Sequence, residues 1–186
     1  MTVNVDAGGE PRSGSSVIEV RVRKQPQFLP EVGPVSQSVR GQAAFIELPG
    51  GKNLIALLAS GSIGEHQDYP REVVPWQFKL NLSNDRALVR LPVLRGQWEL
   101  ATDRLPTLVT VGDPNDAATA QVVRSDQIDR MLGVHLRSIT IEMTADAVPS
   151  PDIETKLPFL VTQRQHRLEI TRSDGFTPNY SSFVRN

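Results

Sequence analysis

His66 and Asp68 come closer to a metal-binding motif than any other residues in the sequence. One residue separates them, within a polar loop that precedes the tryptophan-containing region of the chain. Side chains on a strand repeat with period two, so a histidine and a carboxylate in this spacing can point the same way and share one metal ion. A distant histidine would complete the set. His135 is the better candidate because it lies in a predicted strand, and His166 is the second.

The order His-x-Asp followed by a distant His resembles the metal triad of the double-stranded β-helix Fe(II) oxygenases. The resemblance implies a small metal-dependent β-barrel enzyme with Fe(II) held by His66, Asp68 and His135. It covers only these residues. That family usually has a basic residue a short way after the distal histidine to bind the co-substrate, whereas Ala145 and Phe176 stand at the corresponding positions here. The competing interpretation is an exposed or hydrogen-bonded loop histidine.

Other catalytic chemistry finds little support. The chain has no cysteine, which excludes a disulfide framework, a thiolate nucleophile and a cysteine-based metal site. The glycine-containing segments 50–52 and 61–64 match neither the phosphate-binding loop nor the dinucleotide-binding fingerprint. Ser62 lacks the G-x-S-x-G context of a hydrolase elbow. We therefore assign no catalytic or cofactor-binding residue and favour a protein without enzymatic activity.

Composition narrows the class of protein further. The length of 186 residues favours one domain, and a formal net charge of −1 argues against a nucleic-acid binder that neutralises phosphates. We find no secretory signal, and no apolar run approaches the ~20 residues of a membrane span. These features predict a cytoplasmic protein or one assembled into a particle. An acidic stretch at 101–156 and a basic one at 157–186 can attract each other within or between copies.

Alternation of apolar and polar residues predicts that most elements are strands. The clearest is 16–24, in which Ile18, Val20 and Val22 alternate with charged residues. Further strands are predicted at 43–48, 53–59, 107–112, 134–144, 157–163 and 167–171. The hydrophobic parity of 134–144 changes near Ser138, which indicates a bulge there or burial on both faces.

The stretch 73–101 has the same period-two pattern and contains both tryptophans. It predicts three antiparallel strands in a meander, with Trp76 and Trp98 in the core. If both tryptophans proved to be exposed on one face, a carbohydrate-binding module would become the better interpretation. Helical character is confined to the region after Ala117: Asp126 is expected to cap a short helix that ends at Gly133, and 117–124 fits either a strand or a helix.

Together these patterns predict an all-β fold, an antiparallel β-sandwich or jelly-roll-like barrel of about nine to eleven short strands with one or two short helices. Residues 1–15 are expected to form a flexible arm, 16–172 the sandwich domain and 173–186 a polar tail. Three aromatic residues in the tail can pin it to the body or to a neighbour. The proline-containing stretch 25–39 is expected to be an extended surface connection.

The function favoured by these features is a non-enzymatic structural or interaction subunit of a larger assembly, for example a virion or phage shell component. Its expected partners are protein subunits, copies of itself first. The alternative is the Fe(II) oxygenase-like enzyme, and the third possibility is a ligand- or carbohydrate-binding module.

Overall fold

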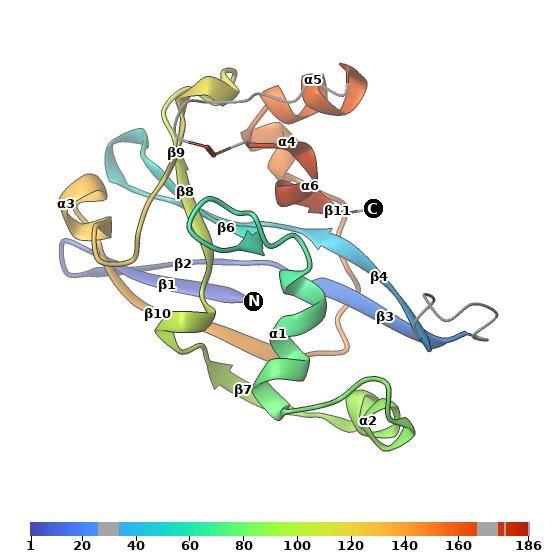
Figure 1. The fold of residues 1–186 in the computed structure, drawn as a ribbon. Coiled ribbons are helices and arrows are strands. Elements are labelled where there is room, and N and C mark those ends of the chain that lie inside the picture. Colours follow the sequence, from blue (N-terminus) through green and yellow to red (C-terminus); the bar gives the residue numbers. More distant parts are fainter. Residues whose placement is uncertain (26–33, 167–174, 177, 186) are drawn as a thin grey trace.

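The computed structural model describes residues 1–25, 34–166, 175–176 and 178–185. Within these residues the chain forms 11 strands in three antiparallel sheets, together with a few short helices (Figure 1). The predicted all-β, sandwich-like fold is therefore confirmed. No helix in the described part of the chain is long and apolar enough to cross a membrane.

The strands are grouped as follows. The first sheet has the order β2 (Glu10–Ser15), β1 (Thr2–Ala7), β10 (His135–Met143) and β7 (Gly96–Glu99). The second has the order β11 (Val184–Arg185), β4 (Val35–Gln42) and β3 (Ile18–Lys24). The third has the order β5 (Ala44–Glu47), β6 (Asn53–Ser60), β8 (Pro106–Val111) and β9 (Ala120–Val122). The helices are α1 (Tyr69–Phe78), α2 (Asp85–Arg90), α3 (Ile128–Leu132), α4 (Ile153–Lys156), α5 (Phe159–His166) and α6 (Tyr180–Phe183).

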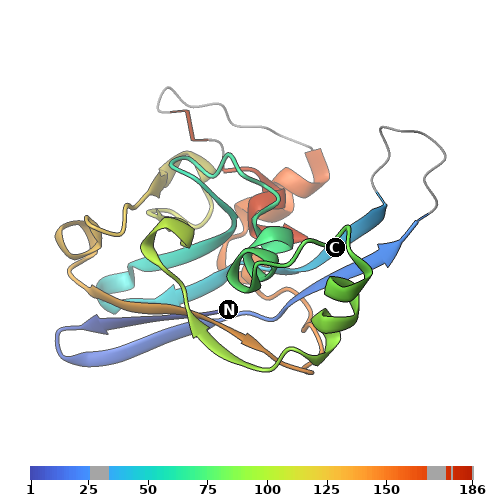
Figure 2. The same ribbon diagram turned by 60° about the horizontal axis from the view of Figure 1, so that its bottom comes forward.

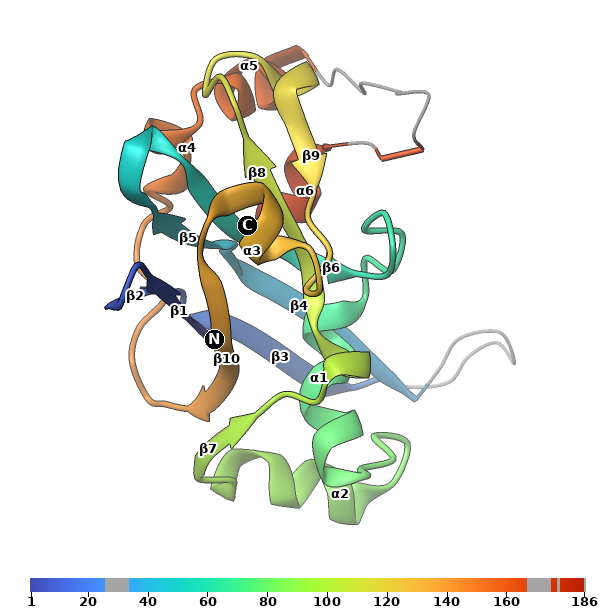
Figure 3. The same cartoon turned by 90° about the vertical axis from the view of Figure 1, so that its left-hand side faces the viewer.

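Strand β6 is the centre of the fold, since all of its residues are buried. Leu54 and Ala56 belong to one hydrophobic cluster, which includes residues of β1 and β10. Ile55 and Leu57 belong to a second cluster, which includes residues of α5 and α6. The third sheet thus lies between the first sheet and the C-terminal helices (Figure 3). Burial on both faces explains why this strand reads as a continuous apolar run.

Several predicted elements are confirmed. Strand β3, the β5–β6 hairpin and strand β8 form where the alternation and the turn residues of the sequence predicted strands. In β10, Asn4 pairs with Ser138 but Val5 pairs with Leu136, so Arg137 is the extra residue of a bulge beside the predicted position. Helix α3 ends at Gly133 with a left-handed φ of 73°, as predicted.

Details of the helical region differ from the prediction. Gln127, not Asp126, is the N-cap residue of α3, and no side-chain bond caps the helix. The ambiguous stretch 117–124 contains a short 3-10 turn followed by β9. Of the extended connection predicted for 25–39, residues 35–39 belong to β4, and 26–33 lie outside the described residues.

The prediction of a flexible arm at residues 1–15 is wrong. Strands β1 and β2 pair along their whole length, and β1 also pairs with β10, which places β1 inside the first sheet. Val3 and Val5 are fully buried. The turn between the strands uses Gly8 and Gly9, both at positive φ. The polar, glycine-containing composition of 1–15 suggested disorder, although Val3, Val5 and Ala7 alternate with polar residues as expected of a strand.

The predicted meander at 73–101 is also wrong. Helix α1 covers its first part and α2 its middle, and β7 is the only strand that forms. Pro70 stands in the first turn of α1, where its missing N–H group costs nothing. The predicted strand at 157–163 is mostly helix α5, and its partner at 167–171 lies outside the described residues.

The end of the chain packs against the body. Phe176 and Phe183 are fully buried in the second cluster, and the Phe183 ring meets Phe159 edge-on at 5.8 Å between ring centroids. Strand β11 pairs with β4 at Gly41 and Gln42. The expectation that aromatic side chains pin this segment to the body is confirmed for these two phenylalanines.

We predict that Gly14→Ala destabilises the protein by about 1–3 kcal/mol, because a methyl group there would lie 2.3 Å from the Phe45 carbonyl oxygen. Gly14 lies where β2 passes close to the backbone of β5. The matched control is Gly112→Ala, whose methyl group would meet nothing nearer than 3.5 Å and whose φ is not positive. Urea unfolding midpoints measure the difference, and equal midpoints for the two variants would show that β2 can move away from β5 at no cost.

Candidate functional site: a groove between β3 and β10

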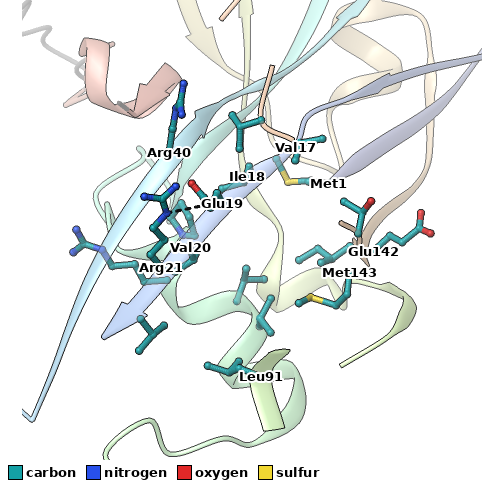
Figure 4. Close-up of a pocket in the computed structure, with 18 of the residues that line it drawn as sticks. Met1, Val17, Ile18, Glu19, Val20, Arg21, Arg40, Leu91, Glu142 and Met143 are labelled. Carbon is teal, nitrogen blue, oxygen red and sulfur yellow. Dashed lines mark ion pairs between the residues drawn. The ribbon is translucent and has the colours of Figure 1, made fainter. Parts of the chain in front are cut away.

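A groove with a volume of about 720 Å³ lies between β3, the end of β10, α1 and the region around α2 (Figure 4). Its floor is apolar and includes Val73 and Val74 of α1, Leu88 of α2 and Leu91. The volume falls within the range of ~300–1,000 Å³ that is usual for ligand sites. This groove is the candidate functional site.

Both walls of the groove are made by consecutive residues. Residues 17–22 line one side and 141–148 the other. The first of these segments belongs to β3, and the second comprises the end of β10 and the irregular residues that follow it.

Within the described residues, β3 is an edge strand, and the end of β10 has β7 as its partner. Strand β3 pairs with β4 alone, on the side away from the groove. Residues 140–143 of β10 pair with β7, whereas the pairing of β10 with β1 stops at Thr140. The backbone N–H and C=O groups of β3 that point away from β4 are thus left for water or for a guest.

Met1, the residue before β1, lies at one end of the groove. Thr2 lies opposite Ser15 on one side and Thr140 on the other. The Met1 ammonium group donates a hydrogen bond to the Ser16 carbonyl at 2.8 Å, and the Ser16 N–H donates to the Met1 carbonyl at 2.9 Å. Met1 therefore lines one end of the groove, and β3 extends past this point together with β4 (Figure 2).

Charge is distributed unequally between the two walls. On the β3 side, Arg21 and Glu19 form an ion pair at 3.0 Å. On the β10 side, Glu142 and Asp146 are exposed and form no salt bridge with any described residue. Burial lowers the pKa of the Met1 ammonium, and the Glu142 carboxylate opposes that shift. The β10 wall is thus the acidic one.

The predicted metal ligands do not meet. His66 is exposed, and its side chain lies 4.0 Å from Glu65. Asp68 forms an ion pair with Arg71 of α1 at 2.5 Å. His135 lies at the start of β10, opposite Asp6 of β1.

In the described parts of the chain, no three His, Cys, Asp or Glu residues are placed to hold a metal ion. The structure therefore does not assemble the triad that the oxygenase resemblance implies. His166 ends α5, and its side chain lies outside what the structure describes.

The tryptophans are not the core residues that the sequence predicted. Trp76 is 42% exposed on α1, and Trp98 of β7 is half-buried. The Phe78 ring meets Trp98 edge-on, with 4.6 Å between ring centroids. Because Trp98 packs against Phe78 in this way, the two tryptophans do not form the exposed pair that a carbohydrate-binding face would need.

Sequence reasoning missed the groove residues. The one available signal is the alternation in 16–24, which predicts a strand but does not indicate that this strand lies at the edge of a sheet.

Tyr69 closes the base of the groove and gives a pH-dependent prediction. Its hydroxyl donates to the Arg104 carbonyl at 3.0 Å, and burial raises the pKa of Tyr69. A raised folded-state pKa means that this contribution to stability is complete below the unfolded value of about pH 10 and is lost as pH rises above it. Tyr69→Phe should cost about 1 kcal/mol at neutral pH.

Above about pH 10 the free energy of unfolding of the variant should decline less steeply than that of the wild type, as measured by urea unfolding across the alkaline range. Parallel curves for the two proteins would exclude Tyr69 as the source of alkaline destabilisation.

No protein-family model, curated protein or solved structure matches the chain. What the protein does has therefore to be inferred from its own geometry.

Proposed function

We propose that this protein is a non-enzymatic interaction subunit that binds an extended segment of another protein in the groove between β3 and β10, and so joins a larger assembly. One observation carries the proposal: β3, an edge strand that pairs with β4 alone among the described residues, lines an apolar groove. A bound strand can form backbone hydrogen bonds with such edges, which is how proteins recognise peptides by strand addition.

The apolar lining supports the same function. Ile18, Val20 and Val22 share one face of β3 and are only half-buried. Together with the floor they offer apolar surface that a guest would cover, at roughly 25 cal/mol for each Å² removed from water. Hydrogen bonds from the edges would add orientation and register.

Assembly of subunits through shared strands is one concrete form of this function. Sheet edges that remain open are sites where another chain can pair. A virion or phage shell component that interlocks with its neighbours, including copies of itself, would use the groove in this way. This form rests on architecture alone, whereas the binding of an extended segment rests on the groove.

The test is selection of peptides from a displayed library of extended sequences on the purified protein. We expect enriched peptides, and we expect Val20→Glu to weaken their binding at least tenfold because it places a carboxylate on the apolar face of the groove. Val89→Glu is the matched control, since Val89 is 74% exposed on α2 and does not line the groove. Circular dichroism and urea unfolding establish that both variants fold.

Two results would contradict the proposed function. One is that no peptide is enriched, or that the enriched peptides bind the folded Val20→Glu variant as tightly as the wild type. The other is that a fluorescent fatty acid binds in a Val20-dependent manner while no peptide does, which would make the groove a site for small apolar ligands.

A further inference from the structure

We infer that the extended segment bound beside β3 is the β3 strand of a second copy of this chain, paired antiparallel across a two-fold axis at Val20. This inference rests on the proposed function and names the partner of the same site. The three-stranded sheets of the two copies would then form one continuous sheet. The basis is the order of apolar, acidic and basic residues in β3, which is complementary to itself.

The edge of β3 is open to such a partner. Among the described residues, β3 pairs with β4 alone. The two strands extend away from the body of the molecule at the end where β3 stops and β4 begins (Figure 2). Two-fold symmetry is the commonest arrangement of identical subunits, and an axis perpendicular to β3 pairs the strand with its own copy in antiparallel orientation.

Antiparallel pairing of β3 with its copy brings apolar residues together. Ile18, Val20 and Val22 alternate with Glu19 and Arg21, so the two groups lie on opposite faces of the strand. Residues directly opposite each other in an antiparallel pair share a face of the sheet. With Val20 opposite the partner subunit's Val20, Ile18 lies opposite the partner subunit's Val22 on each side of the axis. The three apolar side chains, which are half-buried in one copy, would cover one another.

Charge selects this register over its neighbours. With the axis at Val20, Glu19 lies opposite the partner subunit's Arg21, and symmetry repeats the pair. An axis at Glu19 would place two carboxylates opposite each other, and an axis at Arg21 would place two guanidinium groups opposite each other. Opposite charges across a strand pair stabilise it, whereas like charges destabilise it. The ion pair that Glu19 and Arg21 form within one copy, at 3.0 Å, would become part of a group of four alternating charges (Figure 4).

The acidic wall of the groove also suits a second β3. The strand contains three basic residues and one acidic residue, and Arg23 forms no salt bridge with a described residue. Glu142 and Asp146 on the opposite wall are exposed and likewise form none. A second copy of β3 therefore brings excess positive charge to a wall with unpaired carboxylates.

Association is measured by sedimentation velocity of the full chain over a range of concentrations. We expect a reversible monomer–dimer equilibrium. Glu19→Arg and Arg21→Glu should each raise the dimer dissociation constant roughly tenfold or more, because each variant alone places like charges opposite each other. An equimolar mixture of the two should associate to within about threefold of the wild type, because each arginine then faces a glutamate.

Arg90→Glu is the matched control, since it makes the same change of charge at an exposed position of α2 that does not line the groove. It should leave the dissociation constant unchanged, and circular dichroism establishes that all variants fold. A wild type that stays monomeric at the highest attainable concentration would overturn the inference. So would single variants that dimerise like the wild type, or a mixture that associates no better than its components.

The register is tested by disulfide trapping, which is unambiguous because the chain has no native cysteine. Val20→Cys lies on the axis and faces its own copy, whereas Arg21→Cys would reach its copy only diagonally across the strand pair. Val20→Cys should therefore form a disulfide-linked dimer roughly tenfold faster than Arg21→Cys. Faster linkage through Arg21→Cys would overturn the register, and linkage through neither would overturn the pairing.

This inference fails separately from the proposed function. A wild-type monomer that binds library peptides in a Val20-dependent manner would leave the groove as a peptide site and remove the second copy as its occupant. A dimer that persists in the folded Val20→Glu variant would place association on another face and overturn the inference, while the peptide selection still decides the proposed function. A wild-type protein that neither dimerises nor selects a peptide would contradict both.

Discussion

The structure depends on the burial of β6 on both of its faces. Alternate side chains of this strand enter two different hydrophobic clusters, so the third sheet must be covered by the first sheet on one side and by the C-terminal helices on the other (Figure 3). A strand that is apolar at nearly every position buries all of its side chains only when both of its faces are covered. The packing of β1 and β10, and the docking of α5 and α6, are consequences of that requirement.

The groove arises where this layered arrangement is incomplete. The first sheet contains β10 and the second contains β3, and the two sheets are not hydrogen-bonded to each other. Strand β3, the end of β10 with the residues after it, and α1 line an apolar groove between them. The proposed binding of an extended segment depends on the backbone donors and acceptors of β3, which is the edge strand of its sheet.

Sequence patterns predicted the elements in which local preference and tertiary packing agree. The β3 strand, the β5–β6 hairpin, the β10 bulge and the Gly133 helix end all carry local signals of known physical origin. The stretch around Trp76 failed because a period-two pattern over a few residues also fits a short amphipathic helix, and Pro70 in the first turn was the better guide. The His66 and Asp68 pair failed to form a site with His135 because spacing along the chain does not decide whether distant segments meet.

The sequence by itself determined that the chain folds mainly as strands, that cysteine chemistry is excluded, and that apolar and charged residues alternate along β3. These are properties of neighbouring residues, and the period of side chains on a strand follows from backbone geometry. Only the tertiary structure decided that β3 is an edge strand and that it lines a groove with the end of β10 and α1. That outcome depends on packing between residues far apart in the chain, which local patterns do not determine.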